Sequence, residues 1–133
     1  MKGLTDYRMA KRALVRKVSQ GAVSVNDVCD AHPDLLRAAR NIGTPSERQC
    51  PICELADRRA EIPMDENSSL RLVTYVFGPE LRRKSGIPVW TREDLLDLAS
   101  DHRSFMAYTV ECCLVCGWNH LHESVLMGRA HEA

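Results

Sequence analysis

The stretches Cys50-Pro51-Ile52-Cys53 and Cys113-Leu114-Val115-Cys116-Gly117-Trp118 decide how this 133-residue chain is held together. Two cysteines three positions apart can grip one metal ion from a tight turn, and zinc takes four thiolates in a tetrahedral array. The two pairs therefore predict one structural Zn²⁺ site with four ligands: Cys50, Cys53, Cys113 and Cys116. A site closed by four thiolates leaves no position for water, which argues against zinc catalysis.

The second pair leaves one choice open, because Cys112 directly precedes Cys113. The spacing from Cys113 to Cys116 equals that of the first pair, and Gly117 follows where such a turn commonly needs a left-handed residue. We therefore expect Cys113 to be the ligand and Cys112 to face the core or the other side of its strand.

Three further residues could in principle contribute to the metal site. His120 and His122 could replace a cysteine or orient a ligand, although two polar histidines on an exposed strand face are the more common arrangement. Cys29 has no CxxC partner, and a single cysteine on a helix is more often a small buried hydrophobe than a ligand.

The cysteine pairs alternate with segments typical of β-strands. These segments are rich in β-branched, aromatic and aliphatic residues and span 70–77, 105–112 and 118–127. One CxxC turn precedes the first predicted strand and the other joins the second to the third, which is the layout of a zinc ribbon. A helix predicted from a cap at Thr91 to about His102 interrupts it. The fold class predicted is α+β, with a three-stranded antiparallel zinc ribbon and an inserted helix.

The residues before the first cysteine pair predict a helical unit over 1–45, ahead of a ribbon domain over 46–133. Its helices are expected over 5–19, after a cap at Ser24, and from Pro33 to about Asn41. Residues 44–48 are predicted to be a linker. Residues 54–69 are polar and charged, so we expect a flexible loop there.

Charge is divided unevenly along a chain whose formal net charge is zero. Residues 1–49 carry nine Lys or Arg against five Asp or Glu, so the remainder is correspondingly acidic. The predicted helix 5–19 gathers the basic residues on one side. Arg8, Lys11, Arg12 and Arg16 therefore make a candidate surface for an acidic partner or for a nucleic-acid backbone. The overall balance favours a protein partner over one bound through phosphates alone.

The sequence also indicates the cellular compartment of the protein. No apolar run approaches the ~20 residues that cross a bilayer, and the N-terminus lacks the apolar segment of a secretory signal. We therefore expect a cytoplasmic protein without membrane contact, in which six cysteines serve metal binding rather than disulfides.

Several stretches together resemble a known family of short, uncharacterised actinobacterial proteins. The resemblance covers nearly the whole chain apart from 54–69 and the C-terminal tail. It implies a cytoplasmic actinobacterial protein with paired cysteines, and it implies no particular biochemical activity. The stretches are Val28-Cys29-Asp30-Ala31, Asp34-Leu35-Leu36-Arg37-Ala38-Ala39, Cys50-Pro51-Ile52-Cys53, Val76-Phe77-Gly78, Val110-Glu111 with Cys113 and Cys116, and Trp118-Asn119-His120-Leu121.

Three functional classes are compatible with these features. The favoured one is a non-catalytic adaptor that docks on RNA polymerase or another part of the transcription apparatus. A nucleic-acid-binding ribbon, on rRNA or DNA, is the second, although the aromatic content of 5% is low for base stacking. A thiol redox sensor, suggested by the adjacent Cys112 and Cys113, is the third. No phosphate loop, nucleophile elbow or HExxH motif occurs, so the sequence predicts neither an enzyme nor a small-molecule substrate.

Overall fold

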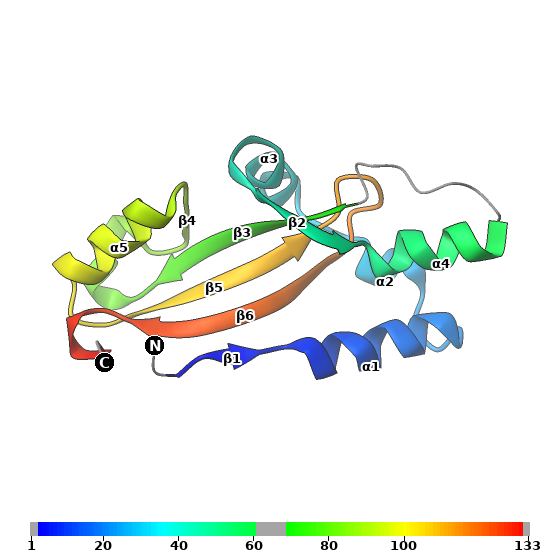
Figure 1. The fold of residues 1–133 in the computed structure, drawn as a ribbon, viewed down its shortest axis with the longest axis horizontal. Helices are drawn as coiled ribbons and strands as arrows, with labels where there is room; N and C mark the ends of the chain where they lie inside the picture. Colours follow the sequence, from blue (N-terminus) through cyan, green and yellow to red (C-terminus); the bar gives the residue numbers. More distant parts are fainter. Residues whose placement is uncertain (1–2, 61–68, 132–133) are drawn as a thin grey trace.

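A computed structural model describes residues 3–60 and 69–131 of the chain and shows a mixed α+β fold built on one antiparallel sheet (Figure 1). The sheet has six strands, five of them in the order β1-β6-β5-β3-β2, with β4 pairing with β3. In chain order the strands are β1 (Thr5–Asp6), β2 (Thr44–Gln49), β3 (Ser69–Phe77), β4 (Ile87–Val89), β5 (Phe105–Cys112) and β6 (Asn119–Met127).

Five α-helices surround this sheet in the described part of the chain. They are α1 (Arg8–Ser19), α2 (Val25–Val28), α3 (Pro33–Ile42), α4 (Pro51–Ala60) and α5 (Arg92–Asp101), and two short 3₁₀ helices lie at Pro79–Lys84 and Arg129–His131. The two predicted N-caps are present. The Ser24 hydroxyl accepts from the amide of Asn26 at 3.3 Å, and the Thr91 hydroxyl accepts from the amide of Asp94 at 3.1 Å.

The three predicted strands are present and adjacent as β3, β5 and β6, all antiparallel. The predicted ribbon has three strands, which is fewer than the structure shows, because β1, β2 and β4 extend the same sheet to six strands. Residues 44–48, predicted as a linker, belong to β2, which pairs with β3. This polar segment contains Pro45, which an edge strand tolerates because one side of it needs no ladder hydrogen bond.

Two other predicted boundaries differ from the structure. Residues 5–6 form β1, which pairs with β6, so the first helix begins only at Arg8. Residues 54–60, predicted as loop, continue α4, which starts at Pro51; residues 61–68 of that predicted loop lie outside the described residues. Proline at the first helical position suits this start, since its fixed φ matches the helix and its missing N–H would have no partner.

Helices α3 and α5 pack on opposite faces of the sheet. On one face Val73 and Cys112 contact Ala39 of α3, and on the other Val76 contacts the α5 side of the molecule. Val73 and Val76 are an odd number of residues apart, so strand alternation directs their side chains to opposite faces. The α5 cluster also contains Phe105, Ala107, Leu95 and Leu98.

A third core cluster holds the end of the molecule where α1, α2 and α4 meet the β5–β6 turn (Figure 1). It joins Val18 of α1 and Val28 of α2 to Cys50, Cys113 and Trp118, so segments from both ends of the chain share one core. No helix among the described residues is long and apolar enough to cross a membrane.

Candidate metal centre

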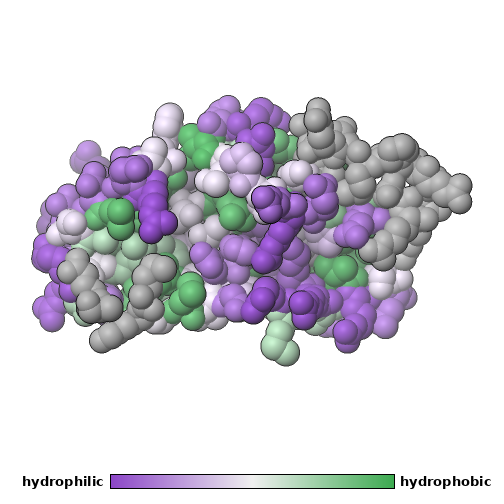
Figure 2. Space-filling model, viewed as in Figure 1, coloured by the Kyte–Doolittle hydropathy of each residue, from purple (hydrophilic) through white to green (hydrophobic). Residues whose placement is uncertain are grey.

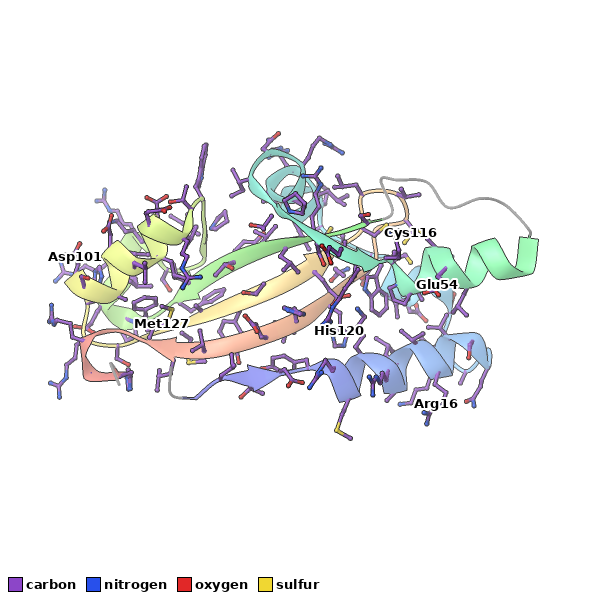
Figure 3. The ribbon with its side chains drawn as sticks, viewed as in Figure 1. Arg16, Glu54, Asp101, Cys116, His120 and Met127 are labelled. Carbon is purple, nitrogen blue, oxygen red and sulfur yellow. The ribbon has the colours of Figure 1, made fainter. Side chains whose placement is uncertain are left out.

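The structure brings the four predicted cysteines together from two places in the chain. Cys50 follows β2 and Cys53 lies in the first turn of α4, whereas Cys113 and Cys116 lie in the turn between β5 and β6. Figure 3 shows Cys116 at the end of the sheet beside the start of α4. A helix N-terminus carries a partial positive charge, which favours thiolate at Cys50 and Cys53.

The sulfur positions match the dimensions of a tetrahedral metal site. The four Sγ atoms all lie within 4.8 Å of one another. The Cys50 and Cys116 sulfurs are 3.6 Å apart, and the Cys53 and Cys113 sulfurs are 3.8 Å apart. A tetrahedron with Zn–S bonds of ~2.3 Å has S–S edges of ~3.8 Å. The four cysteines are therefore positioned to bind a metal ion, and the set fits Zn²⁺.

Backbone amides point at the sulfurs in both turns. The amide of Cys53 donates to Cys50 Sγ at 3.5 Å, that of Val115 to Cys113 Sγ at 3.4 Å, and that of Trp118 to Cys116 Sγ at 3.4 Å. Gly117 has φ +85°, as predicted for this position, and a Cβ there would lie 3.1 Å from the carbonyl oxygen of Cys29. Such N–H donors stabilise thiolate, the form that a metal requires.

Crowding and burial control the protonation of the cluster. Burial, followed by the charges of Cys113 and Cys116, raises the pKa of Cys53 to about 12. Hydrogen bonds with Cys113 and Cys116, together with burial, also raise the pKa of Cys50. Hydrogen bonds from Cys113 and Cys50 lower the pKa of Cys116 to about 2. A cation among the four sulfurs would favour their thiolate forms, which metal binding requires.

A buried polar network ties α1 to the metal centre. Trp118, fully buried beside the cysteines, donates from Nε1 to Oε2 of Glu111 at 2.9 Å. The same carboxylate oxygen lies 2.6 Å from Nζ of Lys11 in α1. Glu111 is 1% exposed, so this ion pair fixes the helix against the sheet in a setting that water barely reaches.

Cys29 packs at the edge of the core and outside the four-cysteine group, but it lies closer to that group than the sequence indicated. It is half-buried rather than buried, and its Sγ lies 3.5 Å from Sγ of Cys116, at the margin of the four-cysteine cluster. Burial, followed by the hydrogen bond with Cys116, raises the pKa of Cys29 to about 12. The loop that carries Cys29 docks on the β5–β6 turn, where the amide of Ala31 donates to the carbonyl oxygen of Gly117 at 3.0 Å. Nothing in the spacing of the chain indicates this approach.

The remaining candidates lie outside the cluster. Cys112 is fully buried and packs with Ala39 and Val73, as expected for a core position. His120 stacks on Trp118 with ring centroids 5.8 Å apart, and Nδ1 of His122 lies 4.0 Å from Glu111. Both histidines are half-buried rather than exposed, and neither belongs to the group of metal-competent atoms. Both contact the network that flanks the site.

The predicted partner surface also forms one continuous feature. Arg8, Lys11, Arg12 and Arg16 of α1 line a groove of about 550 Å³, together with Val15, Ser19, Arg48 and Pro51. Arg48, at the end of β2, was not among the predicted residues. Pro51 immediately follows Cys50, so one wall of the groove adjoins the metal centre.

The fold and the site together define a small α+β protein with four cysteines positioned to bind a metal ion. A model of the family of unknown function DUF5318 matches residues 1–133, and the chain belongs to this family. This confirms the predicted resemblance to uncharacterised actinobacterial proteins.

Two mycobacterial relatives show how far the similarity extends. The uncharacterised proteins Rv0049 of Mycobacterium tuberculosis and Mb0050 of Mycobacterium bovis are each 40% identical to this chain over 128 residues. The match covers 96% of this chain and 84% of each relative. No solved structure matches the chain.

Proposed function

We propose that this protein is a non-catalytic binding module built around a structural Zn²⁺ site. The observation that carries the proposal is the set of four cysteine sulfurs within 4.8 Å of one another. An all-thiolate donor set suits zinc, and four protein ligands complete its coordination without a place for substrate or water. The proposal therefore assigns the metal to folding and stability.

Zinc bound here would crosslink the start of α4 to the β5–β6 turn. The protein's own residues extend this support outward, since Trp118 and Glu111 connect the turn to Lys11 of α1. The basic surface of α1 is thereby held on a rigid base. A small metal-supported core that presents a fixed surface suits docking onto a larger assembly.

For the partner we propose RNA polymerase or another part of the transcription apparatus. The test is affinity purification of the tagged protein from its native cells, with and without nuclease treatment. RNA polymerase subunits that remain after nuclease support the adaptor role. Recovery of the same subunits by a Cys50→Ser variant that has lost its zinc would contradict a role that depends on the metal-supported fold.

A thiol redox sensor is the second candidate, favoured by the 3.5 Å separation of the Cys29 and Cys116 sulfurs. Cys112, on which the sequence-based version of this hypothesis rested, is directed into the α3 core instead. With hydrogen peroxide as oxidant, the thiol of Cys116 would be converted to a sulfenic acid with release of one water. Attack by Cys29 would then form the disulfide and release a second water, so two thiols reduce one peroxide.

This disulfide would remove one of the four thiolates from the ligand set. The test is to treat the zinc-loaded protein with peroxide, follow zinc release with a chromogenic chelator and map disulfides by mass spectrometry. A Cys29–Cys116 crosslink that forms together with zinc release supports the sensor. Equal release from wild type and Cys29→Ser, with Cys112→Ser as the matched control, contradicts it.

A further inference from the structure

The groove beside the metal centre is strongly basic, although the formal net charge of the whole chain is zero. Of its eight lining residues, five are cationic: Arg8, Lys11, Arg12, Arg16 and Arg48. Figure 2 shows hydrophilic side chains along the edge of the molecule where α1 lies. The opposite end carries α5, whose acidic residues are Glu93, Asp94, Asp97 and Asp101. Figure 3 shows Arg16 and Asp101 far apart along the long axis.

Three of these five cations have no acidic partner among the described side chains. Lys11 pairs with Glu111, and Arg8 lies 3.5 Å from Asp6 in an exposed pair. Among residues 3–55 and 69–131, whose side chains are described, no ion pair engages Arg12, Arg16 or Arg48. Three guanidinium groups therefore face one groove without compensation, an arrangement that an external anion would stabilise.

We propose that this groove binds the phosphodiester backbone of a nucleic acid. Arg8, Arg12 and Arg16 are each four residues apart, so they form a row on one helix face with steps of ~6 Å along the axis. A row of evenly placed cations suits a polymer that carries a negative charge on every unit. Guanidinium groups bind phosphate oxygens through two parallel hydrogen bonds, which favours arginine for this role.

The lining also indicates what the groove does not recognise. Among the described residues that line it, Val15 and Pro51 are apolar and none is aromatic. Base stacking and base-edge contacts in a groove of this kind are therefore minor, and binding depends little on nucleotide sequence. A protein partner normally finds an aromatic anchor at the centre of its interface, and the described residues lining this groove include none.

A membrane surface fits the helix less well than a nucleic acid. A helix that lies in a bilayer interface buries an apolar face among the lipids. In α1 the apolar residues Leu14, Val15 and Val18 already pack in the core next to the cysteines. Met9 is the exception at 82% exposed, and one side chain does not make such a face.

This inference rests on the proposed role as a binding module. It assigns the basic groove to nucleic acid and leaves contacts with protein subunits of the transcription apparatus to other surfaces of the molecule. The metal centre contributes indirectly. Arg48 precedes Cys50 by two residues, and Pro51 follows it, so cysteine ligation would fix the groove wall opposite α1.

The experiment measures binding of the zinc-loaded full chain to a fluorescein-labelled oligothymidylate by anisotropy, across a range of salt concentrations. Release of counterions from about three phosphates predicts a log K against log salt slope of about −2 for a single strand. Affinity should therefore fall about 20-fold between about 50 and 200 mM salt.

The two double variants change the charge by the same amount at different places. Arg12→Glu with Arg16→Glu should weaken binding at least about tenfold and reduce the slope by about 1.4. Arg48→Glu, on the facing wall, should act in the same direction. Arg40→Glu with Arg83→Glu, at exposed positions outside the groove, should leave affinity within about twofold of wild type.

Three results would overturn the inference. The first is zinc-loaded wild type that does not bind the oligonucleotide at the lowest salt concentration, and the second is a control pair of substitutions that weakens binding as much as the groove pair. The third is binding of polyglutamate or of phosphatidylserine vesicles as tight as that of the oligonucleotide. Zinc content is measured on every sample. Zinc-loaded protein that does not bind the oligonucleotide contradicts only this inference. Protein that binds the oligonucleotide but contains no zinc contradicts only the proposed metal site.

Discussion

The ion pair between Lys11 and Glu111 gives the sharpest prediction about stability. Its carboxylate is 1% exposed and its ammonium-bearing side chain is 16% exposed, with 2.6 Å between Nζ and Oε2. The change Lys11→Met keeps most of the apolar stem of the side chain and removes its terminal ammonium group. Glu111 then retains the Trp118 hydrogen bond and the imidazole of His122 at 4.0 Å, but loses its close cation.

The expected cost follows from leaving a buried carboxylate without compensation. Removing one partner of a buried pair typically costs ~3–5 kcal/mol, and the partial exposure of Lys11 places this case near ~3 kcal/mol. For a chain of this length, that loss lowers Tm by about 10 °C. Glu111→Gln removes the charge but keeps an acceptor for Trp118, so the double variant should recover much of the loss, with a coupling of about 2 kcal/mol.

Thermal and urea unfolding of the zinc-loaded variants measure these differences. The control is Arg8→Met, which removes a cation from an exposed pair with Asp6 and should cost less than ~1 kcal/mol. If Lys11→Met and Glu111→Gln destabilise the protein additively, the two side chains do not act as a pair. A Lys11→Met variant as stable as its Arg8→Met control would equally refute the reasoning.

Three further predictions concern the cysteines and their turn. Cys50→Ser should abolish zinc binding and cooperative unfolding, because structural zinc sites supply folding free energy. Cys112→Ser should retain one zinc ion per chain. Elemental analysis measures the zinc content of both variants, and calorimetry measures their unfolding. Gly117→Ala should cost ~1–2 kcal/mol, because φ +85° strains any side chain and the new Cβ would lie 3.1 Å from the Cys29 carbonyl; unchanged urea unfolding would contradict this. Cys29→Ser should leave zinc content intact, because Cys29 lies outside the four-cysteine group, so loss of metal in this variant would show it to be a ligand.

The sequence predicted the parts of the fold that have strong local signals. The CxxC spacing identified the four cysteines that meet in space, and the apolar runs located β3, β5 and β6 within one or two residues. These features are encoded locally, by turn chemistry and by side chains that suit a pleated, half-buried surface.

The parts that it missed depend on contacts with distant residues. Strand β2 contains Thr44 and Pro45 but no large apolar residue, and it is a strand because β3 offers it an unpaired edge. Cys29 reaches Cys116 because the Ala31–Gly117 hydrogen bond docks one loop on another 86 residues away in sequence. Neither the pairing nor the docking leaves a periodic pattern in the chain.

The four cysteines are proposed to hold one structural zinc ion. Native mass spectrometry of freshly purified protein, combined with elemental analysis, measures the metal content of each chain. We expect one Zn²⁺ per chain in the wild type and in Cys112→Ser, and none in Cys50→Ser or Cys116→Ser. A wild-type protein that is folded, metal-free and unchanged in Tm after chelator treatment would rule out a structural zinc site.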